Sequence, residues 1–192
     1  AILEDITFVG VTMRDIRNSP VFLRLGTRMR GPAGTPVGTL KRVLISNVTC
    51  HGAVAELPSI ISGGPGHNIE DIKINDVYFH QLGGGTAEMA NLQPPEKEDT
   101  YPEPRMFGTL PAQGFFIRHV KNLEFGNVEI ATEKPDARPA FWLQDVDGAD
   151  FFRVKTSKDA PAFKLTDVKD FRVFGSRSVK DVTADKIESK EF

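Results

Sequence analysis

The sequence predicts an all-β protein built as a right-handed parallel β-helix, in which short strands wind in successive coils around one core. Two observations carry this prediction. An eleven-residue pattern, with apolar residues at its first, fourth, sixth and ninth places, recurs along the chain. In addition, PAFWLQDV at 139–146 returns twenty-two positions later as PAFKLTDV at 161–168. No helical stretch separates these segments, so they are expected to stack as coils of a β-solenoid.

Each copy of the eleven-residue pattern predicts two short strands joined by a bend. Apolar residues two apart mark one buried strand face, and the three-residue step that follows marks a change of direction. The eighth place holds residue types that enter left-handed backbone conformations readily, namely Gly10, Asn47, Asp76 and Asn127. The pattern starts at Leu3, Leu40, Ile69 and Val120, and in weaker form at Val146, Val168 and Val179.

The twin octapeptides predict the other long strand of each coil. Phe141 and Leu143 are expected to lie against Phe163 and Leu165 of the next coil. The segments PVFLRL at 20–25 and GFFIRHV at 114–120 have the same character and are expected to form this strand in earlier coils. A β-sandwich would also contain many short strands, but it would not repeat an octapeptide in register with the following bend.

Composition narrows the classes of function. The 192 residues predict one domain spanning 1–192, and the balance of 24 Lys plus Arg against 26 Asp plus Glu, without a basic cluster among aromatics, argues against a nucleic-acid partner. No apolar run approaches the length of a membrane span, and no signal peptide opens the chain. Cys50 is the only cysteine, which excludes an intrachain disulfide and a cysteine-based zinc cluster.

The first residues already lie inside a predicted strand. ILEDITFVGVTM alternates from Ile2 without a preceding turn or cap. We therefore expect a processed or cut-out piece, corresponding to the C-terminal part of a longer parent fold. A first coil without a cap exposes an unpaired strand edge and core residues, and this predicts homo-oligomerisation or docking of another chain.

Two long insertions interrupt the repeats, at 26–39 and 83–113. Long irregular segments in a compact domain are usually functional or disordered. Arginine forks onto carboxylates and aromatic faces stack on sugar rings, so the insertions predict a site for a sugar acid. The alternative is a lid that covers exposed core, and a short helix is expected from Thr86. The candidate binding residues are Arg28, Arg30, Tyr101, Glu103 and Arg105.

Arg118 and His119 on the strand near the long insertion complete the candidate site. His119 is the best candidate among the histidines, and a satisfied surface residue is the alternative. No histidine lies at metal-ligand spacing from another His or a Cys, so neither a metal nor a cofactor is expected. His67 is interpreted as a turn residue. The acidic pairs Asp145 with Asp147 and Glu96 with Glu103 are expected to be solvated coil edges.

Four segments together resemble the C-terminal coils of bacterial glycoside hydrolase family 28, the polygalacturonases and rhamnogalacturonan-degrading relatives. The resemblance covers nearly the whole chain and implies a β-helix of the pectin-lyase-like superfold, inverting hydrolysis of uronic-acid-containing polysaccharide, and secretion or a periplasmic location. The segments are EDITFVGVTMRDIRNSPVFLRLG, GTLKRVLISNVTCHG, IEDIKINDVYFHQLGGGT and YPEPRMFGTLPAQGFFIRHVKNLEF.

The catalytic motifs of that family have no counterpart in this chain. The family uses Asn-Thr-Asp, an Asp-Asp pair, Gly-His-Gly and Arg-Ile-Lys, and the nearest matches are GHN at 66–68 and DIK at 71–73. Inversion needs a general acid and a base about 6.5–9.5 Å apart. The sequence therefore identifies no catalytic residue, and the residues that carry the family's chemistry are expected upstream.

Three hypotheses about function follow. The first is a pectin-directed glycoside hydrolase, present as its C-terminal portion or as a shortened descendant with a rearranged site. The second is a non-catalytic β-helix that binds acidic polysaccharide through a concave face and the long insertion. The third is an oligomerising structural module that uses the uncapped first coil.

Overall fold

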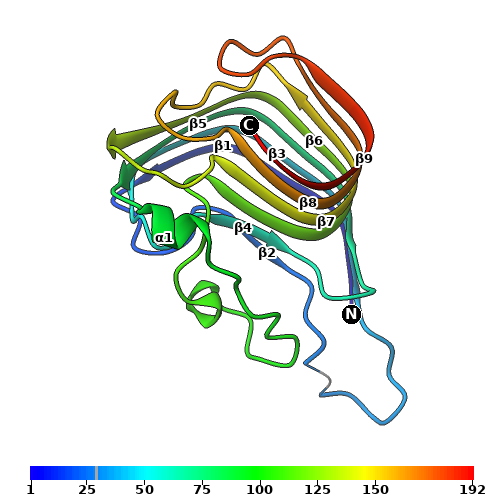
Figure 1. Cartoon of the computed structure of the whole chain (residues 1–192). Helices are drawn as coiled ribbons and strands as arrows, with labels where there is room; N and C mark the ends of the chain where they lie inside the picture. Colours follow the sequence, from blue (N-terminus) through cyan, green and yellow to red (C-terminus); the bar gives the residue numbers. More distant parts are fainter. Residues whose placement is uncertain (29) are drawn as a thin grey trace.

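The structure is a computed structural model that describes residues 1–28 and 30–192, and nearly all of its regular secondary structure is β-strand (Figure 1). Neighbouring strands of its one large sheet run parallel, except for the last pair. No helix among the described residues is long and apolar enough to cross a membrane. The strands are β1 Ile2–Arg14, β2 Phe22–Arg24, β3 Thr39–Ala53, β4 Ser59–Ser62, β5 Ile69–Gly83, β6 Phe115–Lys134, β7 Phe141–Phe152, β8 Phe163–Phe174 and β9 Val182–Glu191.

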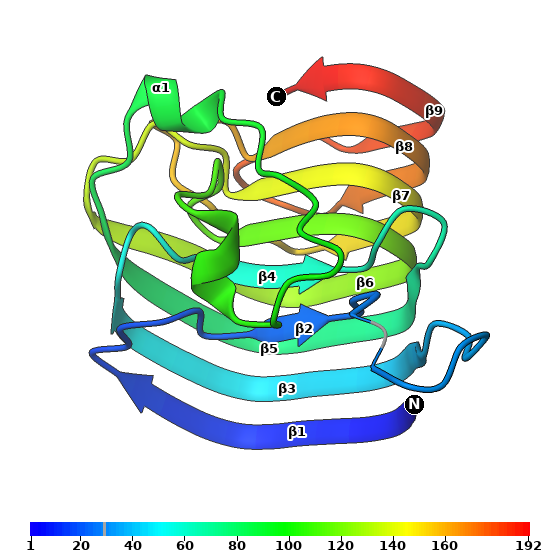
Figure 2. The same cartoon turned by 90° about the horizontal axis from the view of Figure 1, so that it is seen from below.

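The long strands stack in chain order from β1 to β9, with β2 and β4 in a second row (Figure 2). The first places of the eleven-residue pattern lie opposite one another in neighbouring strands. For example, Leu3 pairs with Leu40, and Val120 pairs with Val146. In the second row β2 pairs with β4, and β4 pairs with the first residues of β6. The prediction that residues 20–25 and 114–120 form equivalent strands of different coils is therefore confirmed. Strand β4, which lies between them, was not predicted.

Inward side chains from all the stacked strands form one apolar core. The predicted pairing of the twin octapeptides is confirmed, because Phe141 pairs with Phe163 and Leu143 with Leu165. The ring of Phe141 stacks between those of Phe115 and Phe163, with centroids 5.8 and 5.1 Å away. Each fully buried side chain of this kind contributes roughly 1.5–3 kcal/mol.

Residues with left-handed backbone conformations form the corners where each strand changes direction. The four predicted at the eighth place are confirmed: Gly10, Asn47, Asp76 and Asn127 have φ of 72°, 53°, 55° and 53°. Two further sets of corners were not predicted. They lie at the third place of the pattern and just before its first place, and they include Asp5, Arg42, Asp71 and Asn122, and His119, Asp145 and Asp167.

The last strand corrects one prediction. The weak copy from Val179 was expected to form another parallel coil, but β9 runs antiparallel to β8 and pairs Ile187 with Val168. The chain reverses near Gly175, which has φ of 63° and donates its N–H to Asp181 Oδ1 at 2.9 Å. Strand β9 therefore covers the C-terminal edge of the stack.

The long insertion at 83–113 folds back onto the outer face of the second row, as predicted for a lid. It contains helix α1, Ala87–Ala90, capped by Thr86 as predicted, and the 3₁₀ helix η1, Pro104–Phe107. Three of its apolar side chains pack over Phe116 and Trp142, whose stacked rings have centroids 4.8 Å apart. These side chains are Met106, Phe107 and Leu110.

A buried ion pair anchors the two ends of this insertion. Asp136 accepts from Arg138 Nη2 at 2.6 Å and from the Gly85 amide at 2.9 Å, while Arg138 Nη1 donates to the carbonyls of Ala55 and Leu110 at 2.7 and 3.1 Å. Both side chains are almost fully buried. Burial acts to raise the pKa of Asp136, but the hydrogen bonds and charge of Arg138 hold it below its ordinary value.

The corner at Asp167, with φ of 52°, provides a test of the left-handed positions. Asp167→Val is expected to lower the free energy of unfolding by roughly 1–3 kcal/mol, because a β-branched residue is strained there. Asp167→Gly should change it by less than about 1 kcal/mol, since glycine adopts this conformation freely. Urea unfolding measures both variants, and equal losses for Val and Gly would contradict the corner assignment.

The Asp136–Arg138 pair predicts an acid-dependent loss of stability. Because the pKa of Asp136 is lowered in the folded protein, its contribution is present above the ordinary aspartate value of about 3.9 and is lost as pH falls through the lower folded value. Arg138→Met should lower the free energy of unfolding by about 3–5 kcal/mol at pH 7, since it leaves a buried carboxylate unpaired. In urea titrations between pH 7 and 3, the double variant Asp136→Leu/Arg138→Met should fall less steeply with acid than the parent. An identical slope would exclude this pair as the cause.

Candidate functional site

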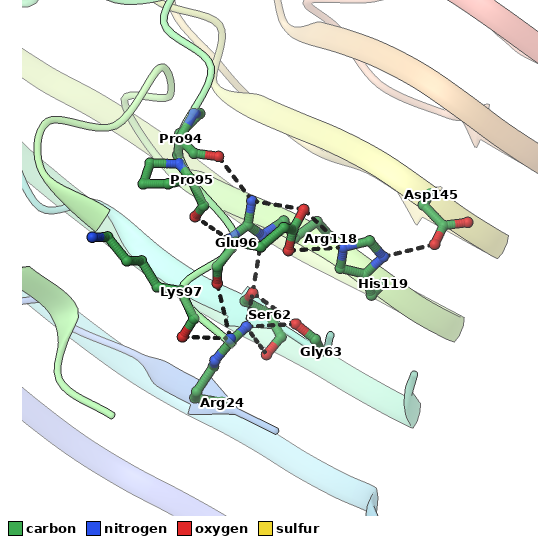
Figure 3. Close-up of polar contacts among 10 residues, drawn as sticks. All are labelled: Arg24, Ser62, Gly63, Pro94, Pro95, Glu96, Lys97, Arg118, His119 and Asp145. Atoms are coloured by element: carbon green, nitrogen blue, oxygen red, sulfur yellow. Dashed lines mark hydrogen bonds and ion pairs between the residues drawn. The ribbon is translucent and has the colours of Figure 1, made fainter. Parts of the chain in front are cut away.

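Two arginines and a serine lie in one outward-facing row beneath the long insertion (Figure 3). Strand pairing places Arg24 of β2 beside Ser62 of β4, and Ser62 beside Arg118 of β6. Their spacing along the row follows from the distance between strands, about 4.8 Å. Two positive charges are therefore held close together on the same face of the coil.

The Arg118 guanidinium is buried and satisfied by backbone carbonyls of the insertion. Its side chain is 1% exposed, and it donates to Pro94 O at 3.0 Å, Pro95 O at 2.7 Å and Ser62 Oγ at 3.2 Å. It also lies over the ring of Phe107, 5.0 Å from the centroid. Burial lowers the pKa of Arg118 to about 10, although the carboxylate of Glu96 opposes that shift.

Arg24 clamps the next residues of the same segment. It donates to Gly63 O at 2.6 Å and Ser62 Oγ at 2.7 Å from one nitrogen, and to Glu96 O at 3.0 Å from the other. Burial lowers the pKa of Arg24 as well. We name residues 94–97 the strap, because the two arginines hold its carbonyls across the face of the coil.

His119 lies at a corner next to Arg118, between two carboxylates. Its Nδ1 is 2.7 Å from Asp145 Oδ2, and its Nε2 is 3.1 Å from Glu96 Oε2. The Glu96 carboxylate also lies 3.2 Å from Arg118 Nη1. Both ring nitrogens thus face carboxylate oxygens, and the strap is joined through His119 to the corner of β7.

The carboxylates of Glu96 and Asp145 have a spacing similar to that of a catalytic pair, but a substrate cannot reach the space between them. Glu96 and Asp145 are separated by the width of the imidazole and one hydrogen bond on either side of it, which is comparable with the interval of about 6.5–9.5 Å in inverting glycosidases. In such enzymes the sugar and the attacking water lie between the two groups. Here the His119 ring fills that space, so the arrangement holds the strap in place and offers no room for the substrate.

The structure brings together some of the predicted site residues and separates others. Glu103 accepts from the Arg105 amide at 3.1 Å, and Arg105 donates to Arg17 O at 2.9 Å, so both stabilise the insertion itself. Arg28 lies over the Tyr101 ring, 5.1 Å from its centroid, and Tyr101 is 63% exposed. Arg30 lines a pocket of about 390 Å³ together with Arg24 and Arg28.

Glu96, Asp145 and Arg24 were not predicted as site residues. Glu96 and Asp145 were expected to be solvated coil edges. The side chain of Asp145 is 58% exposed at its corner, as expected, whereas that of Glu96 is 34% exposed and pairs with Arg118 and His119. Arg24 was overlooked, although PVFLRL and GFFIRHV place Arg24 and Arg118 at the same position of the same strand. The alignment of these two segments could have identified Arg24. The role of the strap could not be predicted, because its interactions use backbone carbonyls, which every residue has.

The remaining predictions about chemical sites have simpler outcomes. The exchange of backbone hydrogen bonds between Gly64 and His67, at 3.0 and 2.8 Å, confirms His67 as a turn residue. In the part of the chain that the structure describes, no three His, Cys, Asp or Glu residues are grouped as metal ligands. Burial raises the pKa of the Cys50 thiol to about 11, which makes it a poor nucleophile.

Comparison with known proteins adds no assignment. No protein-family model, no curated protein and no solved structure matches this chain. The resemblance to glycoside hydrolase family 28 therefore stays a prediction, and the site rests on its geometry alone.

Replacing the buried guanidinium should release the strap. In Arg118→Met the carbonyls of Pro94 and Pro95 lose their donors. Amide hydrogen exchange of Thr27 and Thr100, which donate to Glu98 O and Lys97 O at 2.8 and 3.2 Å, is therefore expected to become at least tenfold faster. The control is Arg172→Met, which removes an exposed arginine of β8 that pairs with Asp150 of β7. Unchanged protection of the two amides in Arg118→Met would show that the strap is held by other contacts.

Proposed function

We propose that the chain is a right-handed parallel β-helix of the pectin-lyase-like kind. The parallel order of β1, β3, β5, β6, β7 and β8, their in-register pairing and the repeated corners support this assignment. Parallel strands joined by crossover connections are right-handed in about 98% of known cases. The antiparallel β9 serves as the closing strand of this arrangement.

We propose further that the protein binds uronic-acid-containing polysaccharide and is related to the pectin-directed glycoside hydrolases that its sequence resembles. The supporting observation is the Arg28–Tyr101 pair, in which a guanidinium lies 5.1 Å from the centroid of an exposed ring. Among the described residues, no hydrogen bond or ion pair uses the Arg28 guanidinium. Its donors are free to fork onto a carboxylate.

The surroundings of this pair suit an acidic sugar. Arg28 also lines the pocket of about 390 Å³ that Arg24 and Arg30 share, so three arginines gather around this pocket. A pyranose stacks on an aromatic face while an arginine binds its carboxylate. Arg118, Glu103 and Arg105 are engaged with the insertion and are not included in the proposed glycan site.

Hydrolysis is the second candidate, and the spacing of Glu96 and Asp145 is the observation that favours it. The two carboxylates have the separation of an inverting pair, but the His119 ring lies between them. Catalysis would require the imidazole to leave this position. We therefore rank binding first.

Affinity for polygalacturonate tests the proposal. Binding is expected for the parent chain, with a loss of at least tenfold in Arg28→Ala and in Tyr101→Ala, because each removes one half of the sugar-acid contact. The matched control is Arg177→Ala, an exposed arginine at the far end of the stack, which should bind like the parent. Isothermal calorimetry measures affinity, and uncharged cellulose fragments serve as the non-acidic ligand.

The same samples separate the two candidates. If the parent chain releases reducing ends from polygalacturonate, and this release is lost in Glu96→Gln and in Asp145→Asn, the protein is a hydrolase and the proposal of binding without catalysis is wrong. Equal binding of the parent, Arg28→Ala and Tyr101→Ala would remove this surface as the glycan site. All variants are compared with the parent by circular dichroism.

A further inference from the structure

Two histidines that lie far apart in the sequence meet on the outer face of the stack. Strand pairing places His51 of β3 directly beside His80 of β5, and their ring centroids are 5.9 Å apart. Their neighbours Cys50 and Phe79 are fully buried, so the alternation of side chains along each strand turns both imidazoles outward. The pair lies within the row of strands, because β1 lies beside β3 and β6 lies beside β5 (Figure 2).

The ring nitrogens of this pair are accessible to a ligand. No nitrogen of either ring is buried without a partner, and among the described residues no hydrogen bond or ion pair uses one of them. His119, in contrast, directs both of its nitrogens at the carboxylates of Asp145 and Glu96. His51 and His80 are therefore two adjacent imidazoles whose nitrogens no described protein group occupies.

A β-bulge follows the pair directly. Gly52 is an extra residue in β3, inserted after the regular pair of His51 with His80. It has φ of 71°, and a β-carbon on it would come within 2.9 Å of Asp15 Oδ1. Bulges are over-represented next to functional sites, where they re-aim a side chain. This bulge ends the regular pairing after the histidines and admits a carboxylate close to them.

A third ring packs against both histidines. The centroid of Tyr78 lies 5.4 Å from that of His51 and 6.3 Å from that of His80. Contact with this ring restricts the rotation of the imidazoles. A ligand bound by both imidazoles therefore removes less side-chain freedom than it would from two isolated surface histidines.

The separation of the two imidazoles suits one transition-metal ion. Neutral imidazole is the commonest metal ligand in proteins and is suited to zinc, copper and nickel. Two imidazoles on one tetrahedral ion, with metal–nitrogen bonds of about 2.0–2.1 Å, have ring centroids roughly 5 Å apart. The centroids of His51 and His80 are 5.9 Å apart, so side-chain rotations that shorten this distance by roughly 1 Å bring a nitrogen of each ring onto one ion.

We propose that His51 and His80 together bind a divalent transition-metal ion of the zinc, copper and nickel group, with water in its remaining coordination positions. The sequence did not predict this site, because only the register of β3 and β5 brings the two histidines together. The thiol of Cys50 is buried in the core and is not a ligand. This proposal is independent of glycan binding.

The end of β1 provides a way to distinguish a cation from an anion at this site. Arg14 is exposed and pairs with His51. Its guanidinium repels a metal ion and attracts an anion. Arg14→Met is therefore expected to bind zinc at least as tightly as the parent does. Absence of zinc binding by the parent, together with phosphate binding that Arg14→Met abolishes, would identify an anion site and overturn the proposal.

Calorimetric titration of the untagged full chain with zinc chloride tests the pair. His51→Gln and His80→Gln should each weaken zinc binding at least tenfold, because one imidazole alone cannot hold the ion at the high effective concentration that the second provides. The matched control is His67→Gln, which removes an exposed histidine of a turn and should bind zinc like the parent. Circular dichroism checks that each variant is folded.

Histidine NMR spectra provide a second measurement. Zinc should shift the ring resonances of His51 and His80 together and leave those of His67 and His119 unchanged. Equal zinc affinity of the parent, His51→Gln and His80→Gln would overturn the proposal. So would a shift of the His67 or His119 resonances without a shift of this pair, because the ion would then bind elsewhere.

Discussion

Left-handed corners at fixed places of the repeat hold every other feature of this protein in register. Because side chains alternate with a period of two, a slip of one residue between neighbouring strands would turn the inward apolar residues out to solvent. The corners prevent such a slip, since a residue such as Asn47 meets another left-handed residue, Asp76, only when the strands are aligned. The core, the alternating charges of Glu4, Lys41 and Glu70 in neighbouring strands, and the arginine row all depend on this alignment.

The sequence predicted the corners at the eighth place of the pattern and missed the others, although Asp5, Asp71 and Asn122 are of the same residue types. Asn, Asp and Gly at the eighth place predict a corner, because these residue types enter the left-handed region at low energetic cost. Arg42 and His119 carry no such mark. In the structure Arg42 binds Asp5 and Glu4, and His119 binds Asp145 and Glu96, so long-range partners support their conformations.

The direction of the last strand could not be read from the pattern for a related reason. Apolar steps of three, two and three residues read the same forwards and backwards, so β9 matches the template in either direction. The reversal is decided by the turn at Gly175 and by Phe192, whose ring lies 5.4 Å from that of Phe163. Neither contact is visible in the spacing of apolar residues.

For the candidate site, the sequence identified useful residue types but not their tasks. Arg118 was predicted to meet a sugar carboxylate, and it meets the carbonyls of Pro94 and Pro95 instead. A buried guanidinium has five donors to satisfy, and the strap and Ser62 accept from them, so Arg118 is not available to a ligand. Among the described residues none accepts a hydrogen bond from the Arg28 guanidinium, which is why the proposed glycan site uses Arg28 instead.

The two ends of the stack differ in how their last strand is paired. At the C-terminal end β9 places Lys186 beside Lys169, so the alternation of charge stops there, and apolar contacts of Ile187 and Phe192 hold the closing strand. An antiparallel strand thus needs no charge match. At β1 the alternation is intact up to Glu4, and the corners at Asp5 and Gly10 repeat the geometry of the parallel interfaces within the stack. The charges and corners of β1 are therefore those of the parallel interfaces within the stack, whereas β9 departs from both.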